Sequence, residues 1–417
     1  MHGLPAGRSA PMAGPGTRTP SRRRPPARRV PFALVLVLLV APAATGSGIA
    51  ARPLAGSWTL LPAAPVAPEE GLASVWTGRE MIVFGRVTRR AKDGAVLERV
   101  NVAEAYDPAA DTWRRLPSPG RTGSFMSQSA GWTGKEMLVW GQGVREAFDP
   151  LTNRWRPLPD SPYLAVHDGF GLVAWTGREL IGWGGGCCGD AFSDGVAYNP
   201  TTNTWRKLAP APPAGSQHPA GAWTGRELIV LVGEFDPDGD PWPARLARAA
   251  AYNPATDTWR RIAPPPATRY GASAVWDGGE VLVVGGTGAP SAGRPPAPAA
   301  VGFAYDPATN RWRRLPRMES GRVGAVAVWT GRRLLVWGGS ETTGAGLPVI
   351  PPHGLAFDPT SNRWSPLPQA PLSGRLDATA VWSGGAMIVW GGRRPAIPLG
   401  TGTRFLADGA AFTPKRP

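Results

Sequence analysis

Apolar residues recur along most of the chain in short runs that polar turns separate, and the order of these runs repeats. Each unit has small residues ending in Trp, a polar turn, an apolar run ending in Gly, and an aromatic residue followed by Asp-Pro or Asn-Pro and a second Trp. Residues 324–364 illustrate the pattern, which predicts strands at 324–329, 334–339, 355–357 and around Trp364. Short β-branched or aromatic runs bounded by Gly, Pro, Asn and Asp are typical of strands.

The unit occurs seven times. The first Trp of each copy lies at Trp76, Trp132, Trp175, Trp223, Trp276, Trp329 and Trp382, and the second at Trp58, Trp113, Trp155, Trp205, Trp259, Trp312 and Trp364. Two positions with seven occupants each therefore hold 14 of the 19 Trp, which indicates that these Trp belong to a repeated framework.

A period of about 50 residues with four strands per unit resembles the Kelch-repeat family of β-propellers, over residues 55–414. The residues that carry the resemblance are the double glycines Gly184-Gly185, Gly285-Gly286, Gly338-Gly339 and Gly391-Gly392, the aromatics Tyr106, Phe148, Tyr198, Tyr252, Tyr305, Phe357 and Phe412, and the seven second Trp. Three copies have Gly85-Arg86, Gly141-Gln142 and Gly233-Glu234 instead of a double glycine. The resemblance implies an all-β fold, a seven-bladed Kelch-type β-propeller.

The phase of the repeat predicts how the ring closes. A lone fourth strand precedes the first full unit at 57–60, and a lone third strand follows the last at 410–412. Each lacks what the other supplies, so we expect the N-terminal strand to complete the last blade and to remove an open sheet edge.

The first 44 residues have the pattern of an export signal. An Arg- and Pro-rich segment precedes the apolar run 32–40, and small residues follow it. The run is much shorter than the roughly 20 residues of a membrane-spanning helix, which leaves a retained anchor as the alternative. We therefore predict a signal peptide over 1–44, a short linker over 45–54, the propeller over 55–414, a tail over 415–417, and a secreted or extracytoplasmic protein.

Composition narrows the class of protein. The chain has 55 Gly and 48 Pro, which disfavours a mainly helical protein, and its 19 Trp argue against disorder. The leader holds seven of the 45 Lys and Arg and none of the 30 acids, so the remainder carries 38 minus 30, or +8. Half of the net +15 charge therefore lies in the leader, and we expect no nucleic-acid partner.

The only cysteines are the adjacent Cys187 and Cys188, which excludes a disulfide framework and a four-thiolate metal site. An exported chain meets an oxidising compartment, and the sequence offers neither thiol another cysteine as a partner. We therefore expect a disulfide between Cys187 and Cys188, with two free thiols as the alternative.

The candidate ligand site lies where the long, variable loops emerge, at the starts of the innermost strands. Seven positions before the first Trp, Arg269, Arg322 and Arg375 occupy one register position in three consecutive blades, and Glu69 and Asp168 occupy it across the ring. Guanidinium groups bind carboxylate or sulfate bidentately, which predicts an anionic ligand such as an acidic sugar or a peptide carboxylate. The alternative is that these arginines hydrogen-bond neighbouring loop carbonyls.

His167 and His218 belong to adjacent blades on the same loop-rich face. Nothing in their spacing fixes a metal-binding geometry, so they are candidate ligand contacts. We assign no metal and no cofactor.

The function that follows is an exported module that binds a ligand, a glycan or a protein, as a monomer. The resemblance also implies an enzyme alternative, because copper radical oxidases of the galactose oxidase family and sialic-acid mutarotases share the Kelch propeller. No catalytic motif of either family can be carried over to residues of this sequence, and fold does not decide function.

Overall fold

The computed structural model describes residues 53–66, 68, 70–91, 96–119, 129–141, 144–161, 171–186, 191–213, 215–232, 248–267, 269–288, 297–342, 348–395 and 403–415. All of them belong to one compact unit, Ala50–Pro417. Within this part of the chain, no helix has the length and apolarity needed to cross a bilayer. The predicted signal peptide and most of the predicted linker lie outside the described residues and stay predictions.

Seven four-stranded antiparallel sheets form the unit, one for each copy of the repeat. Their strands are β2 (Glu70–Trp76), β3 (Met81–Arg90), β4 (Val96–Asp107) and β5 (Thr112–Arg115) in blade 1; β6 (Ser129–Trp132), β7 (Met137–Gly141), β8 (Val144–Asp149) and β9 (Arg154–Pro157) in blade 2; β10 (Leu172–Trp175), β11 (Leu180–Trp183), β12 (Gly195–Asn199) and β13 (Thr204–Lys207) in blade 3; and β14 (Ala220–Trp223), β15 (Leu228–Leu231), β16 (Ala249–Asn253) and β17 (Thr258–Arg261) in blade 4.

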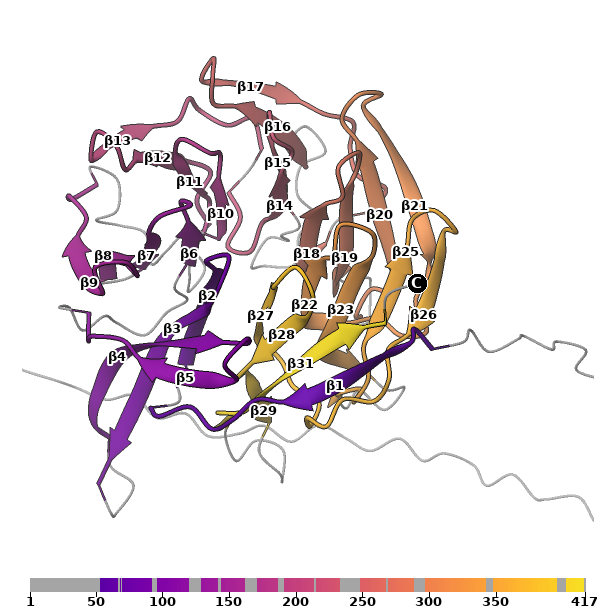
Figure 1. Cartoon of the computed structure of the whole chain (residues 1–417). Coiled ribbons are helices and arrows are strands. Elements are labelled where there is room, and N and C mark those ends of the chain that lie inside the picture. The colour runs from indigo at the N-terminus through magenta and orange to yellow at the C-terminus, as the bar shows by residue number, and fades with distance from the viewer. Residues whose placement is uncertain are drawn as a thin grey trace, which may run out of the picture. The chain divides into compact units, whose positions relative to one another are not determined.

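The remaining blades follow the same order. Their strands are β18 (Tyr270–Trp276), β19 (Val281–Thr287), β20 (Val301–Asp306) and β21 (Arg311–Arg317) in blade 5; β22 (Val323–Trp329), β23 (Leu334–Thr342), β25 (Leu355–Asp358) and β26 (Arg363–Pro366) in blade 6; and β27 (Thr379–Trp382), β28 (Met387–Trp390), β31 (Gly409–Pro414) and β1 (Gly56–Leu60) in blade 7. The first strand of every blade lies nearest the centre of the ring (Figure 1). The predicted all-β, seven-bladed propeller is confirmed.

The N-terminal strand closes the ring as the phase of the repeat predicted. Strand β1 pairs with β31 from Gly56 opposite Pro414 to Leu60 opposite Ala410. The Leu61 amide donates to the Gly409 carbonyl at 3.0 Å, and the Lys415 amide donates to the Ala55 carbonyl at 2.8 Å. Blade 7 is therefore assembled from both ends of the described chain.

The core lies between blades. Second strands supply fully buried aromatics, including Trp140, Trp183, Trp337 and Trp390, and apolar clusters each join residues of neighbouring blades. First strands carry small side chains because they crowd around the axis. The size of the side chains in each run of the sequence thus follows the distance of its strand from that axis.

The second Trp of each repeat links its blade to the preceding one. In every blade the indole N–H donates to a backbone carbonyl of the previous blade, over 2.7 to 3.0 Å. The acceptors are Pro62, Pro117, Pro159, Ala209, Ala263, Pro316 and Pro368. Because the set includes Trp58 and Trp113, it continues across the closure of the ring.

The double glycines make a second link between blades. The amide of Gly286 donates to the Arg322 carbonyl at 2.8 Å, and the amide of Gly339 donates to the Arg375 carbonyl at 2.9 Å. Both glycines have positive φ, 74° and 79°, which a side chain rarely tolerates. The glycine pair thus bends the end of the second strand toward the next blade.

Candidate functional site

The two faces of the ring differ in what their residues do. The turns after the first strands form the turn face, and in blades 1 to 5 each places a Glu against an Arg of the fourth strand. The pairs are Glu80–Arg114, Glu136–Arg156, Glu179–Arg206, Glu227–Arg260 and Glu280–Arg313. Two guanidinium nitrogens bind two carboxylate oxygens in each of them, for example at 3.1 and 2.7 Å in Glu179–Arg206. Bidentate geometry is the strongest arrangement of this ion pair.

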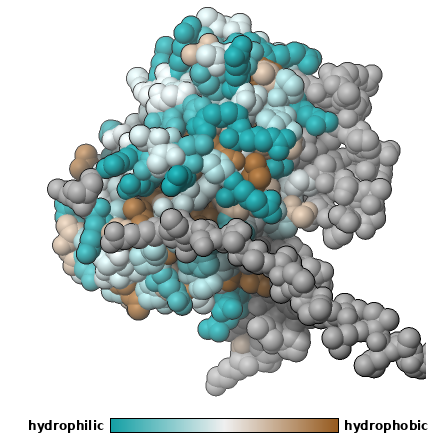
Figure 2. Space-filling model, turned by 90° about the vertical axis from the view of Figure 1, so that its right-hand side faces the viewer, coloured by the Kyte–Doolittle hydropathy of each residue, from teal (hydrophilic) through white to brown (hydrophobic). Residues whose placement is uncertain are grey.

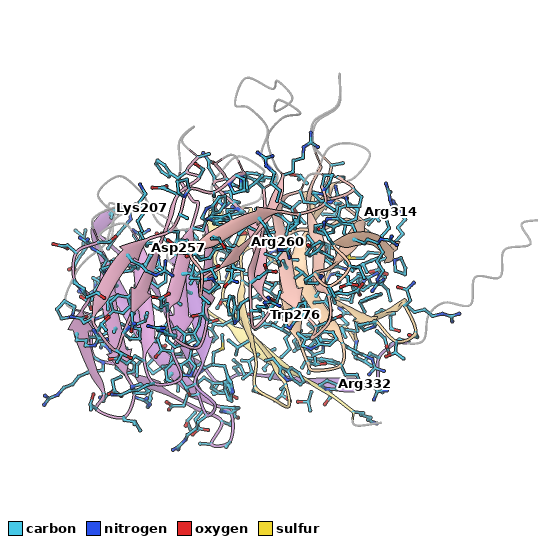
Figure 3. The ribbon with its side chains drawn as sticks, turned by 90° about the horizontal axis from the view of Figure 1, so that it is seen from above. Lys207, Asp257, Arg260, Trp276, Arg314 and Arg332 are labelled. Carbon is cyan, nitrogen blue, oxygen red and sulfur yellow. The ribbon has the colours of Figure 1, made fainter. Side chains whose placement is uncertain are left out.

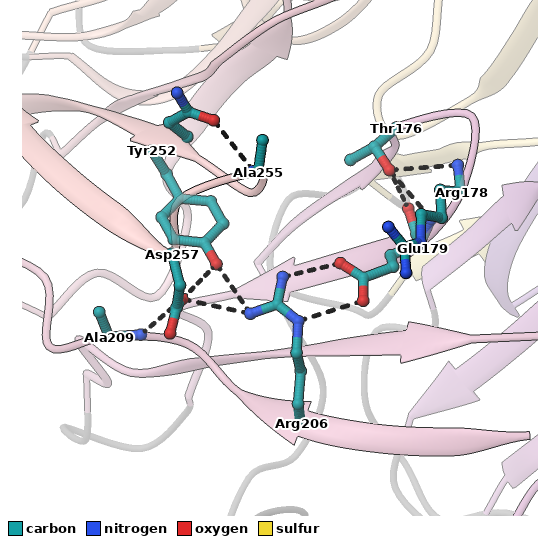
Figure 4. A network of polar contacts seen from close by, with 9 residues as sticks. Thr176, Arg178, Glu179, Arg206, Ala209, Tyr252, Ala255 and Asp257 are labelled. Atoms are coloured by element: carbon teal, nitrogen blue, oxygen red, sulfur yellow. Dashed lines mark hydrogen bonds and ion pairs between the residues drawn. The ribbon is translucent and has the colours of Figure 1, made fainter. Parts of the chain in front are cut away.

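The same arginines reach the next blade. Arg206 of blade 3 also donates to the Tyr252 hydroxyl at 3.0 Å and to Asp257 at 3.2 Å, both in blade 4 (Figure 4). The hydrogen bonds from Arg260 hold the pKa of Glu227 below its ordinary value. These charges are engaged in joining blades, so the turn face is a poor candidate for a ligand site.

The outer side of the ring is polar. Fourth strands are sheet edges, and Arg115, Lys207, Arg261 and Arg314 occupy one exposed register position on them. Figure 3 labels Lys207 and Arg314 of this set. The side that carries β21 and β26 is largely hydrophilic, with apolar side chains in small scattered groups (Figure 2). Charged edge strands of this kind resist pairing with other chains.

The opposite face, here called the loop face, is uneven. In blade 1, β3 and β4 extend beyond the sheet as a long hairpin that projects from the ring (Figure 1). In blade 6, β23 pairs with the short β24 (Pro348–Val349), and in blade 7 β29 (Arg393–Pro395) pairs with β30 (Thr403–Phe405). Variation of this kind on a rigid scaffold marks the loop face as the candidate functional face.

A cavity of about 350 Å³ opens in the central channel, lined by first strands of blades 3 to 7. Its walls are mainly Ala and Gly, with the hydroxyl groups of Ser273 and Thr379 among them. Ser273 donates to the Ala325 carbonyl at 2.9 Å, and the hydroxyls of Thr379 and Ser74 lie 2.5 Å apart. The channel therefore offers a small recess walled by short side chains, with the hydroxyl groups of Ser273 and Thr379 already bonded.

Polar side chains flank this recess on the loop face. His218 precedes the lining residue Pro219 and packs edge to face on Tyr270, with ring centres 5.0 Å apart. Asp377 precedes the lining residue Ala378 and accepts a hydrogen bond from Arg393 Nε at 2.6 Å. Although part of His218 is exposed, desolvation lowers the pKa of its imidazole, and the charge of Asp377 opposes that shift. We call His218, Tyr270, Asp377 and Arg393 the mouth residues.

Two of the three predicted ligand arginines are completely buried. Arg322 Nη1 donates to the carbonyls of Gly338 and His353, each at 3.0 Å. Arg375 Nη1 donates to the carbonyls of Gly391 at 3.1 Å and Asp408 at 3.2 Å, and binds the Asp408 carboxylate at 2.6 Å. Neither guanidinium reaches solvent, so the contacts favour the structural alternative over ligand binding.

Arg269, the third, is half-buried. It donates to the Val301 carbonyl at 3.1 Å and lies over the ring of Phe303 at 4.7 Å. Burial, with the nearby charge of Arg314, lowers its pKa. The one register position that predicted a binding crescent therefore holds loop-tying arginines in this conformation.

The other predicted site residues divide in two groups. His218 lies among the mouth residues, while Glu69, His167, Asp168, Cys187 and Cys188 lie outside the described residues, so the predictions for them stay predictions. Within the described ranges, no three His, Cys, Asp or Glu side chains are grouped so as to hold a metal ion.

Blade 1 contains a buried polar network that the sequence analysis missed. Arg86 pairs with Glu70 at 3.1 Å, Thr88 donates to the other oxygen of Glu70 at 3.0 Å, and the fully buried Glu104 accepts from the Val66 amide at 2.6 Å. The signal was available, because Arg86 stands where four other blades have the second glycine.

The fold and this face define a class, a seven-bladed β-propeller with a Kelch motif. A family comparison matches residues 268–319, which cover blade 5, to the Kelch motif. Alpha-scruin from Limulus polyphemus is 28% identical over 147 residues, which are 35% of this chain and 15% of that protein. Kelch-like protein 36 from Mus musculus is 27% identical over 183 residues, which are 43% of this chain and 28% of that protein. The matched segments thus span less than a third of these relatives.

Solved structures share the fold at low identity. One, described as the structure of YjhT, has 15% identity and a TM-score of 0.50, and covers 73% of this chain and 99% of that one. Another, a fungal alcohol oxidase of the AA5 family in complex with copper, has 14% identity and a TM-score of 0.56, and covers 86% of this chain and 76% of that one. At such identity the likeness concerns the fold alone.

Proposed function

We propose that this protein is an exported binding module that holds a protein partner on its loop face, with the mouth residues as the centre of contact. The observation that carries the proposal is the open recess in the channel, flanked by an imidazole, a phenol and an exposed ion pair. Kelch propellers commonly act as protein-interaction modules, and the recess would receive a side chain of the partner. The apolar run 32–40 supports export.

Crosslinking from defined positions tests the proposal. A photoreactive phenylalanine analogue replaces Tyr270 on the loop face or, as the matched control, Arg226 on the turn face, in cells that produce the protein. We expect a protein adduct from position 270 and none from position 226, in the extracytoplasmic fraction. Adducts of equal yield from both positions, or from position 226 alone, would contradict a loop-face partner site.

Within the described residues, the enzyme alternative has no site of its own in support. The likeness to a copper-containing alcohol oxidase is one of fold, at 14% identity. Measuring copper bound to the protein after loading and desalting addresses it directly, since an oxidase of that kind requires a stoichiometric metal.

A further inference from the structure

The β29–β30 hairpin of blade 7 sets two arginines against each other. Arg394 lies directly opposite Arg404 in the antiparallel register, so both side chains are on the same side of the two-stranded ribbon. Like charges at directly opposed positions destabilise a strand pair. Arg404 is exposed and Arg394 is half-buried, so solvent and solutes can reach the pair.

No carboxylate compensates this pair. Among the described residues, neither guanidinium forms an ion pair or a hydrogen bond, and the two nearby acids are already engaged: Asp377 with Arg393 and Asp408 with Arg375. Residues 371–408 contain four Arg and two Asp, a net charge of four minus two, or +2. The excess charge is that of Arg394 and Arg404.

The corresponding hairpin of blade 1 shows the ordinary solution. There, Arg89 lies directly opposite Glu98, and the two side chains pair at 3.0 Å. Both hairpins extend from the second and third strands of their blades on the loop face. A directly opposed pair is thus a neutral ion pair on the blade 1 hairpin and an uncompensated double cation on the blade 7 hairpin. Counted from the first Trp of each blade, Arg394 aligns with Thr88, one residue before Arg89.

We propose that Arg394 and Arg404 form a binding site for a tetrahedral oxyanion, a phosphate or sulfate group. A local arrangement that opposes folding and has no compensation within the protein is typical of a functional site. A phosphate or sulfate ester suits two guanidinium forks on one face, because its three terminal oxygens offer more acceptor sites than the two oxygens of a carboxylate. The pair shares no residue with the mouth residues, although Arg394 follows Arg393 in β29, and its proposed ligand does not depend on the protein partner proposed above.

The test is a calorimetric titration of the purified protein with inorganic phosphate, inorganic sulfate, glucose 6-phosphate, glucose 6-sulfate and acetate, at constant ionic strength. We expect saturable binding of the tetrahedral anions and none of acetate. Tighter binding of the sugar esters than of the inorganic ions would assign the group to a glycan, and the reverse order to the free ion. Acetate binding as tight as that of phosphate would overturn the choice of ligand.

Variants test the pair itself. Arg404→Gln should weaken phosphate binding at least tenfold, and Arg404→Glu, which copies the Arg89–Glu98 arrangement, should abolish it without lowering the unfolding midpoint of the ligand-free protein. Arg89→Gln is the matched control and should leave phosphate affinity unchanged. Glu98→Arg, which places a second double cation on the blade 1 hairpin, should add a phosphate site. Parent-like phosphate affinity in Arg404→Gln would overturn the proposal, even if Arg404→Glu failed to fold.

Discussion

Blades 1 to 5 differ from blades 6 and 7 in their polar contacts. In the first group a Glu–Arg pair on the turn face extends into the next blade, as Arg206 does toward Tyr252. At the corresponding positions blade 6 has Arg333 and Ser365, and blade 7 has Ala386 and Thr59. On the loop face, blades 6 and 7 have the completely buried Arg322 and Arg375, whose guanidinium groups donate to carbonyls of their own blade.

The difference shows that arginine contacts can stabilise a blade on either the turn face or the loop face. Apolar packing and the Trp-to-carbonyl bond are common to all seven blades, and they suffice to define a blade. The turn-face or loop-face arginine adds a second set of hydrogen bonds, and its position differs between blades. In blades 6 and 7 a buried arginine ties the second-to-third connection on the loop face, in blades 1 to 4 an arginine ties the turn face, and blade 5 has both, in Arg269 and Arg313.

Removal of β1 should have the largest effect on this arrangement. Deleting residues 45–62 removes the pairing with β31 and the Trp58 indole, in the blade that has no Glu–Arg pair to replace them. We expect a loss of at least about 4 kcal/mol in unfolding free energy, because the deletion removes both a partly buried Trp and the pairing of a whole strand. Chemical denaturation measures it. A truncated protein with the parent's midpoint would show that the ring does not depend on this closure.

Loss of a buried loop-face arginine should come next. Arg375→Met leaves the Gly391 and Asp408 carbonyls without their donor, so we expect a loss of about 2–3 kcal/mol in unfolding free energy. The control Arg363→Met changes an exposed arginine of blade 6 and should have little effect. An Arg375→Met protein that is as stable as its parent but binds an anionic ligand less tightly would favour the binding crescent instead.

A turn-face arginine should matter less, and its effect should depend on pH. Arg260→Met leaves Glu227 without its bidentate partner, and we expect a loss of about 1 kcal/mol near pH 7, because the pair is partly exposed. The folded-state pKa of Glu227 is depressed, so this contribution is present above the unfolded pKa and is lost as pH falls through the folded value.

Denaturation of parent and variant between pH 7 and pH 3 checks this, and the two stability curves should converge at the acidic end. The double change Arg260→Met with Glu227→Gln should recover part of the loss. A constant difference across the whole pH range would mean that the Arg260 side chain acts through packing rather than charge.

Adding the missing pair to blade 6 should have the smallest effect. The double change Arg333→Glu with Ser365→Arg copies the arrangement of blade 5, at the cost of the Arg333–Asp358 pair. Blade 7 offers no Tyr or Asn at the position that such an arginine contacts in the next blade, since Phe412 stands there. We expect a gain of about 0.5 kcal/mol, measured by thermal unfolding. A larger gain would show that the pair is sufficient within one blade.

Most of the fold could be predicted because its determinants are local and repeated. Each first Trp, glycine pair and second Trp marks a strand end, and the lone strands at 57–60 and 410–412 predicted the closure. The observed strands differ little from the expected ones; β23, for example, continues past the predicted residue 339 to Thr342, where it pairs with β24.

The candidate site was much less predictable, because it depends on burial and on pairing across strands. The register placed Arg322 and Arg375 correctly at the start of the innermost strands, but sequence spacing does not show that loop carbonyls enclose them. Glu227 and Arg260 are 33 residues apart, and only the strand order brings them together. Tyr270 and Asp377 carry no motif, and their role follows from the channel beneath them.

The closure has a consequence for the order of events during synthesis. The bond from the Trp58 indole to the Pro368 carbonyl joins residues 310 positions apart, and β1 pairs with a strand that is made later still. A growing chain can complete blades 1 to 6 one after another. The ring nevertheless stays open, because β1 cannot pair until β31 has been synthesised. Since the entropy of closing a loop rises only slowly with its length, the delay is one of time rather than of free energy. Strand β1, although synthesised before every other strand of the ring, is thus the last to pair.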